Sequence, residues 1–214
     1  MSRGRLRFIH SPMFAGKTAN MLLAAKHAKT CGKVVLLMKP QADTRCKVDV
    51  IKSRCGMEMC CDLSVGSEFD FVKDVCYEGV DIVFVDEAQF LSSWQIESLR
   101  EAVDVHGISV WCYGLLTDFK KCLFDGSKRL VELSDELSEI QVLCGMCKEN
   151  ARFHLRYVDG KPSTSGPTID IEMPGCEKYA SVCHACWKRR MEPVMNGGYE
   201  TPNFEVVAID IQQK

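Results

Sequence analysis

The feature that most constrains the fold is the segment 11–18, which has the sequence SPMFAGKT. It nearly matches the phosphate-loop pattern G-x-x-x-x-G-K-[ST], in which backbone N–H groups of a tight loop surround phosphate oxygens. Gly16 permits a close approach of the backbone, Lys17 supplies positive charge, and the Thr18 hydroxyl suits Mg²⁺. The pattern predicts a loop that joins a buried strand to the N-terminus of a helix.

Ser11 stands where the pattern has glycine, and serine would be strained there if the position required a positive φ. The alternative interpretation is an ordinary strand–turn–helix that carries a lysine by chance. The flanking segments argue against that alternative, because Leu6–His10 is strand-like and 18–30 is rich in helix formers.

Apolar runs alternate with helical patterns through the first part of the chain. The runs 34–38, 82–85 and 108–113 are short and apolar, which is typical of buried parallel strands, and Lys39-Pro40 is expected to end the first. Ser92, with a glutamine three residues later, forms a capping box and predicts the start of a helix. The alternation predicts an α/β fold of the phosphate-loop NTPase type, a parallel sheet flanked by helices.

Two acids, Asp86 and Glu87, directly follow the apolar run 82–85. Many strands end in acids, so this pair alone would carry little weight. With a phosphate loop about 70 residues upstream, an acid at this place is expected to hold Mg²⁺ through water. Asp86 is the better candidate for the metal side, and Glu87 for the base that accepts a hydroxyl proton.

Two C-x-x-C pairs mark the C-terminal part of the chain. Four thiolates can complete a closed, tetrahedral Zn²⁺ site of the structural kind. The alternative is four free buried thiols, and His184 or Cys176 are further possible ligands, although neither completes a second pair. The predicted zinc ligands are Cys144, Cys147, Cys183 and Cys186.

Composition narrows the class of protein further. The net charge of -2 gives no broad attraction to nucleic acid or anionic lipid, and no apolar stretch approaches the length of a membrane span. The N-terminus leads straight into the strand-like run, without the apolar segment of a signal peptide, so a cytoplasmic location is expected. In that setting the 13 cysteines are expected to be reduced thiols and metal ligands.

The character of the sequence changes near residue 140, which suggests three segments. We predict an ATP-binding α/β domain over 1–140, a small zinc-ribbon-like domain over 141–191, and a tail over 192–214. Within the tail, Phe204–Ile211 is a candidate for a short strand.

Three motifs occur in one order: PMFAGKT at 12–18, DEAQF at 86–90, and the paired cysteines. Together they resemble the cytosolic, zinc-containing (type II) thymidine kinase family. The likeness covers roughly residues 5–190 and includes three further segments: 43–45, 113–119 and 178–183.

The resemblance implies transfer of phosphate from ATP to the 5′-hydroxyl of thymidine, with deoxyuridine as an extension, in nucleotide salvage. It implies Mg²⁺ and structural Zn²⁺, a homotetramer, Glu87 as the base, and Arg45 as a cation that steadies phosphate charge. The residues expected to contact ATP and its Mg²⁺ are Ser11, Pro12, Met13, Phe14, Ala15, Gly16, Lys17, Thr18, Asp43, Thr44, Arg45, Asp86 and Gln89.

The resemblance also implies a nucleoside pocket closed by a lasso-like loop over about 148–182. The alternative interpretation is that Phe90, Phe119 and Phe124 are ordinary residues of the hydrophobic core. Two departures from the family pattern bear on base preference: Pro174 removes a backbone donor, and His154 replaces threonine or methionine near the base. The expected pocket residues are Met13, Phe90, Leu115, Phe119, Phe124, Asp170, Ile171, Glu172, Met173, Pro174 and Tyr179.

Two other hypotheses compete with the kinase. A phosphate-loop ATPase with a zinc ribbon that acts on nucleic acid predicts a basic, aromatic-rich surface. The near-neutral charge and the aromatic content of 8% argue against it. A non-catalytic, zinc-braced interaction module would have no use for Lys17, Thr18 and Glu87.

Overall fold

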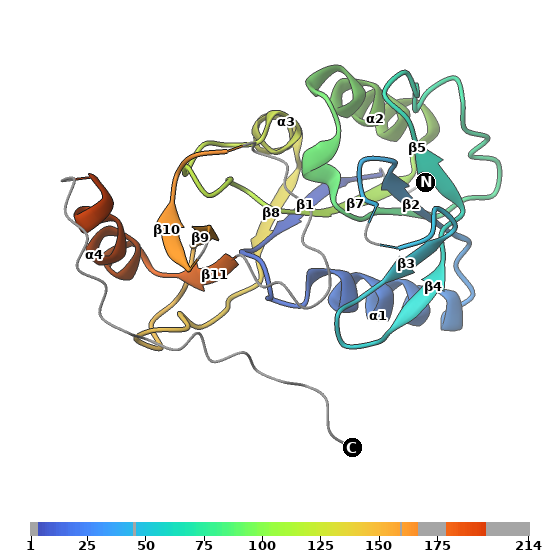
Figure 1. The fold of residues 1–214 in the computed structure, drawn as a ribbon. Coiled ribbons are helices and arrows are strands. Elements are labelled where there is room, and N and C mark those ends of the chain that lie inside the picture. The colour runs from blue at the N-terminus through green and yellow to red at the C-terminus, as the bar shows by residue number, and fades with distance from the viewer. Residues whose placement is uncertain (1–3, 45, 159, 167–178, 196–214) are drawn as a thin grey trace.

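The computed structural model describes residues 4–44, 46–158, 160–166 and 179–195 (Figure 1). The strands of its central sheet are β1 (Leu6–His10), β2 (Val35–Pro40), β5 (Leu63–Val65), β6 (Ile82–Val85), β7 (Ser109–Gly114) and β8 (Glu136–Glu139). They form one six-stranded sheet in the order β5-β2-β6-β7-β1-β8, and every pair in it is parallel. The predicted α/β class with a parallel sheet is confirmed.

Helices cover both faces of this sheet (Figure 1). They are α1 (Lys17–Thr30) on one face, and η1 (Ala88–Phe90), α2 (Ser93–His106) and α3 (Asp125–Leu133) on the other. Neighbouring strand residues alternate between the two cores: Phe8 packs on the α2 side, whereas Ile9 packs on the α1 side. The predicted capping box is present, with Ser92 accepting from the Gln95 N–H.

One strand differs in extent from its prediction. β2 continues through Lys39 and Pro40, where Pro40 pairs with Val65 of β5. Pro40 lies beyond the β2–β6 pairing, which ends at Met38, so its missing N–H leaves that ladder intact. Lys39 is fully buried, and its ammonium donates to the carbonyls of Lys47 at 2.9 Å and Val50 at 2.8 Å. These two backbone acceptors offset the free-energy cost of burying the ammonium group. The sequence pattern did not predict that Lys39 would be buried.

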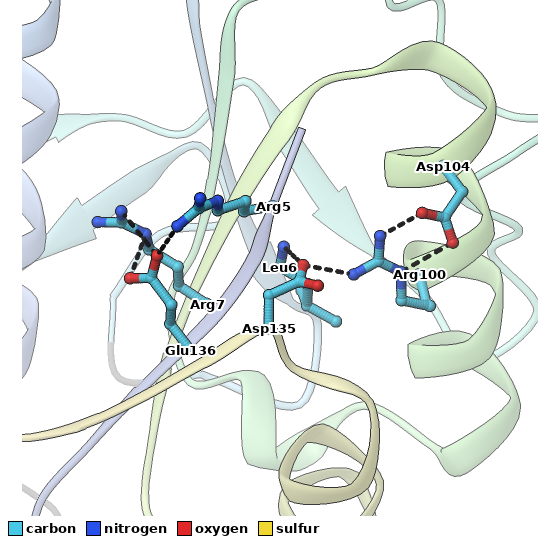
Figure 2. Close-up of polar contacts among 7 residues, drawn as sticks. All are labelled: Arg5, Leu6, Arg7, Arg100, Asp104, Asp135 and Glu136. Carbon is cyan, nitrogen blue, oxygen red and sulfur yellow. Dashed lines mark hydrogen bonds and ion pairs between the residues drawn. The ribbon is translucent and has the colours of Figure 1, made fainter. Parts of the chain in front are cut away.

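Charged contacts fasten the edge strand β8 to β1, as Figure 2 shows. Glu136 pairs with Arg5 at 2.6 Å and with Arg7 at 2.9 Å. Asp135, just before β8, accepts from the Leu6 N–H at 2.8 Å and from Arg100 of α2 at 2.7 Å. These contacts attach the sheet edge to α2 at the point where the chain turns toward its C-terminal part.

A small second sheet lies to one side of the central one (Figure 1). It has the order β10-β9-β11 and packs with helix α4 around its own core, which includes Trp187 and Met191. The bounds are β9 (Phe153–Val158), β10 (Lys161–Ser163), β11 (Tyr179–Val182) and α4 (His184–Met195). A separate hairpin of β3 (Val50–Lys52) and β4 (Glu58–Cys60) packs near α1.

Helix α4 extends to Met195 and includes Pro193, so regular structure continues into the segment predicted as a tail. The candidate strand Phe204–Ile211 and the alternative ligand Cys176 lie outside the described residues. Among the helices that the structure describes, none has both the length and the apolar character needed to cross a membrane.

Candidate active site and metal centre

The phosphate loop joins the end of β1 to the start of α1. Its left-handed positions are Phe14 (φ 63°) and Gly16 (φ 75°), and Ser11 is not among them. Serine in place of glycine is therefore not strained by a positive φ. The Lys17 ammonium is buried and donates to the carbonyls of Pro12 at 2.9 Å and Ser11 at 3.4 Å, so it lies within the loop.

Thr18 and Asp86 meet across the junction between α1 and β6. The Thr18 hydroxyl donates to the Asp86 carboxylate, with oxygen–oxygen distances of 3.0 and 3.3 Å. Both side chains are buried. A hydroxyl beside a carboxylate supplies the hard oxygen ligands that Mg²⁺ prefers.

Glu87 follows Asp86 in a left-handed conformation, with φ 49°. Gln89 orients it, because its side-chain amide donates to the Glu87 carboxylate at 2.6 Å and accepts from the Leu115 N–H at 3.0 Å. Gly114 makes this approach possible, since a Cβ there would lie 2.7 Å from Oε1 of Gln89. A non-glycine residue with positive φ is typical of functional sites, where surrounding contacts offset the strain.

Aromatic rings gather beside this carboxylate end of the sheet. Phe90 and Phe124 pack edge to face with centroids 6.1 Å apart, and Phe119 lies 6.3 Å from Tyr179 of the small sheet. The Arg156 guanidinium lies 5.0 Å from the Phe119 ring. The expected pocket residues Met13, Phe90 and Leu115 are partly buried, whereas Phe119, Phe124 and Tyr179 are buried.

Other expected contacts are only partly described. Asp43 is buried just after β2, and Thr44 beside it is exposed. Arg45, Asp170, Ile171, Glu172, Met173 and Pro174 lie outside the described residues, as does much of the expected lasso loop.

The four cysteines of the C-x-x-C pairs converge beside the second sheet: Cys144 and Cys147 precede β9, Cys183 directly follows β11, and Cys186 lies in α4. Their sulfur atoms all lie within 4.8 Å of one another, and Cys147 and Cys183 are 3.5 Å apart. A tetrahedral zinc ion with Zn–S distances of about 2.3 Å places its sulfurs about 3.8 Å apart, so the cluster fits Zn²⁺. Burial raises the pKa of Cys144, but N–H donors such as that of Met146 outweigh it and lower the pKa to about 7, whereas burial and the neighbouring thiols raise the pKa of Cys186.

Three further residues lie at the phosphate loop without having been predicted as its ligands. His154 and Ser181 of the small sheet contact the main chain of Met13, and the Arg54 guanidinium lies 4.4 Å from the Phe14 ring. Arg54 belongs to no motif that the sequence analysis identified. Ser181 lies in segment 178–183 of the family likeness, but no role was predicted for it. His154 stood out only as a departure from the family pattern.

The thymidine kinase family model matches residues 4–187 of the chain. This chain belongs to the thymidine kinase family. The match includes the phosphate loop, the acid pair and all four cysteines of the cluster. The resemblance inferred from the motifs is therefore confirmed.

Individual members of the thymidine kinase family agree with this assignment. A thymidine kinase of Encephalitozoon cuniculi (strain GB-M1) is 62% identical over 190 residues, which are 89% of this chain and 90% of that protein. The thymidine kinase of Enterobacteria phage T4 is 38% identical over 186 residues, covering 85% of this chain and 94% of the phage protein. A thymidine kinase of Streptococcus thermophilus (strain CNRZ 1066) is 36% identical over 186 residues, which are 86% of this chain and 93% of that protein.

Proposed function

We propose that the chain transfers the γ-phosphate of ATP to the 5′-hydroxyl of thymidine, giving dTMP and ADP. The observation that carries this proposal is the junction of Thr18 with Asp86, which brings a phosphate loop beside the buried Glu87 in a thymidine kinase family member. Deoxyuridine is the expected second substrate, since it differs from thymidine by one methyl group.

Positioning and charge stabilisation supply most of the catalysis in phosphate transfer. The N–H groups of the phosphate loop and the N-terminus of α1 would bind phosphate oxygens, and Lys17 would stay close to the outer phosphates. Thr18 and Asp86 would hold Mg²⁺, directly or through water, and that ion would neutralise charge on the β- and γ-oxygens. This role fits the buried hydroxyl–carboxylate pair.

Glu87 is the proposed base. As the 5′-oxygen forms its bond to the γ-phosphorus, the bond from that phosphorus to the ADP oxygen breaks, and the hydroxyl proton passes to the Glu87 carboxylate. The hydrogen bond from Gln89 supports this assignment because it holds the carboxylate in one orientation at the end of β6.

The aromatic group around Phe119, Phe124 and Tyr179 is the proposed site for the base and sugar. We assign the remaining contacts to the loop over about 148–182, with a structural Zn²⁺ bound by the four cysteines at its base. The cytoplasmic location, the homotetramer and the division into segments 1–140, 141–191 and 192–214 belong to the same proposal, by family resemblance.

An assay with radiolabelled ATP, Mg²⁺ and a panel of nucleosides tests the proposal. Thymidine should become labelled, and Glu87→Gln should lower kcat by a factor of about 100 or more. Glu68→Gln, at an exposed position, is the matched control and should retain the wild-type rate. If the wild-type protein hydrolyses ATP but labels no nucleoside, the proposal fails and the nucleic-acid ATPase becomes the leading hypothesis.

A further inference from the structure

Met13 belongs to the phosphate loop, yet the small sheet binds both polar groups of its main chain. The Ser181 hydroxyl donates to the Met13 carbonyl at 2.6 Å, across 168 positions of sequence. The Met13 N–H makes a longer hydrogen bond, 3.5 Å, to Nδ1 of His154. Two successive peptide units of the loop are therefore held from outside it.

The two residues that bind Met13 are neighbours in the small sheet. His154 of β9 and Ser181 of β11 are directly opposite each other in the antiparallel register. Ser181 is also tied to the metal cluster, because its carbonyl accepts from the N–H of Gly145, which lies within the first C-x-x-C pair, at 3.1 Å. One short path of hydrogen bonds thus runs from the cysteine cluster to the phosphate loop.

The protonation of His154 agrees with its role as an acceptor. Its ring is buried, and burial, followed by the charge of Lys17, lowers its pKa to about 3, so the ring is neutral at physiological pH. The ring also donates a hydrogen bond to the backbone carbonyl of Thr117. A neutral ring that donates through one nitrogen offers the other to the Met13 N–H.

The contacts at Met13 also determine which way the neighbouring N–H groups of the phosphate loop point. In a trans peptide the C=O and the following N–H point in opposite directions. When Ser181 draws the Met13 carbonyl toward the small sheet, the N–H of Phe14 turns away from that sheet. In the preceding peptide unit the Pro12 carbonyl accepts from Lys17 at 2.9 Å while the Met13 N–H faces His154.

We propose that Ser181, with His154, is a positioning residue for ATP. Ser181 holds the peptide unit after Met13 so that the Phe14 N–H is directed toward phosphate, and His154 fixes the peptide unit before Met13. The small sheet beside the cysteine cluster thereby sets the conformation of the loop between β1 and α1. The inference rests on the proposed function, since it assigns ATP to this loop.

Equilibrium binding tests the proposal without the reaction. Calorimetry with Mg²⁺ and the non-hydrolysable analogue AMP-PNP, without nucleoside, should give a Kd about 5- to 10-fold higher for Ser181→Ala than for wild type, the loss of one hydrogen bond. Ser181→Thr keeps the hydroxyl and should restore the affinity. In steady state the KM for ATP should rise for Ser181→Ala, while the KM for thymidine changes by less than about 2-fold.

Ser98→Ala is the matched control. Ser98 lies on α2, where its hydroxyl donates to Asp70 at 2.7 Å, and loss of that hydroxyl should leave AMP-PNP affinity unchanged. Zinc content is measured for every variant. If Ser181→Ala does not retain zinc, His154→Leu carries the test, and it should weaken AMP-PNP binding in the same direction.

Three results would overturn the proposal. The first is wild-type AMP-PNP affinity in zinc-loaded Ser181→Ala or, where that variant loses zinc, in His154→Leu. The second is an equal loss of AMP-PNP affinity in Ser98→Ala, and the third is a failure of Ser181→Thr to restore the affinity. Failure of the proposed function is a separate result, since a protein that labels no nucleoside would still bind AMP-PNP and allow this comparison.

Discussion

The hydroxyl of Thr18 lies 3.0 Å from one carboxylate oxygen of Asp86 and donates to it, joining the first turn of α1 to the end of β6. The two residues are 68 positions apart in the sequence. Their contact brings the phosphate loop and the acid pair to one edge of the sheet, as expected for parallel strands whose carboxyl ends meet there.

Asp86→Asn should raise the Mg²⁺ concentration needed for half-maximal activity and lower kcat by at least about 10-fold, because an amide is a weaker Mg²⁺ ligand than a carboxylate. The measurement is the initial rate as a function of Mg²⁺ at fixed ATP. Asp81→Asn is the control, since Asp81 precedes the other end of β6 and pairs with Lys33 at 3.0 Å. A normal Mg²⁺ dependence in Asp86→Asn would remove Asp86 from the metal side.

Gly114→Ala should lower kcat by about 10- to 100-fold, because displacement of the group that orients a reacting carboxylate by about 1 Å has effects of this size. The new Cβ would lie 2.7 Å from Oε1 of Gln89 and 3.1 Å from its backbone nitrogen, so Gln89 must move away from Glu87. Gly66→Ala meets only the flexible side chain of Gln41 at 3.4 Å and serves as the control. Full activity in Gly114→Ala would show that Gln89 does not position the base.

Cys147→Ser should remove the bound zinc and lower the melting temperature by about 10 °C, because metal binding contributes directly to folding in small metal sites. Zinc content by mass spectrometry and thermal unfolding measure the two effects. Cys122→Ser, at an exposed position outside the cluster, should keep both values. Full zinc content in Cys147→Ser would contradict the four-cysteine site.

Acid should destabilise the protein through His154. Its pKa falls from 6.5 to about 3 on folding, first because of burial and then because of Lys17. The unfolded chain therefore binds a proton that the native state does not, and stability decreases as the pH falls from about 6.5 toward 3. This single group should cost about 2 kcal/mol between pH 7 and pH 5.

Urea unfolding at pH 7 and pH 5 checks this value when wild type is compared with His154→Asn, which lacks the titrating group. The small cavity beside His154 is also lined by His10, Glu139 and Arg152, so the comparison isolates His154 from those neighbours. His27→Asn, at an exposed position on α1, is the control and should behave as wild type. An equal loss of stability in His154→Asn would assign the acid sensitivity to another group.

Sequence alone determined the elements whose signals are local. The segment 11–18 specifies a strand-to-helix loop, Ser92 with Gln95 specifies a helix start, and apolar runs specify buried parallel strands. Spacing also predicted the cysteine cluster, since two close pairs of one ligand type can form a single tetrahedral site. In each case the responsible residues lie within a few positions of one another or repeat one short motif.

Only the tertiary structure decided which distant residues meet. Three features depend on how the strands pack: the burial of Lys39, the space that Gly114 leaves for Gln89, and the hydrogen bond from Ser181 to Met13. The neighbouring sequence does not predict these contacts. The physical reason is that the hydrogen bond from Ser181 to Met13, 168 positions apart, forms only when the small sheet packs against the loop between β1 and α1. Local propensity and spacing carry no information about that docking.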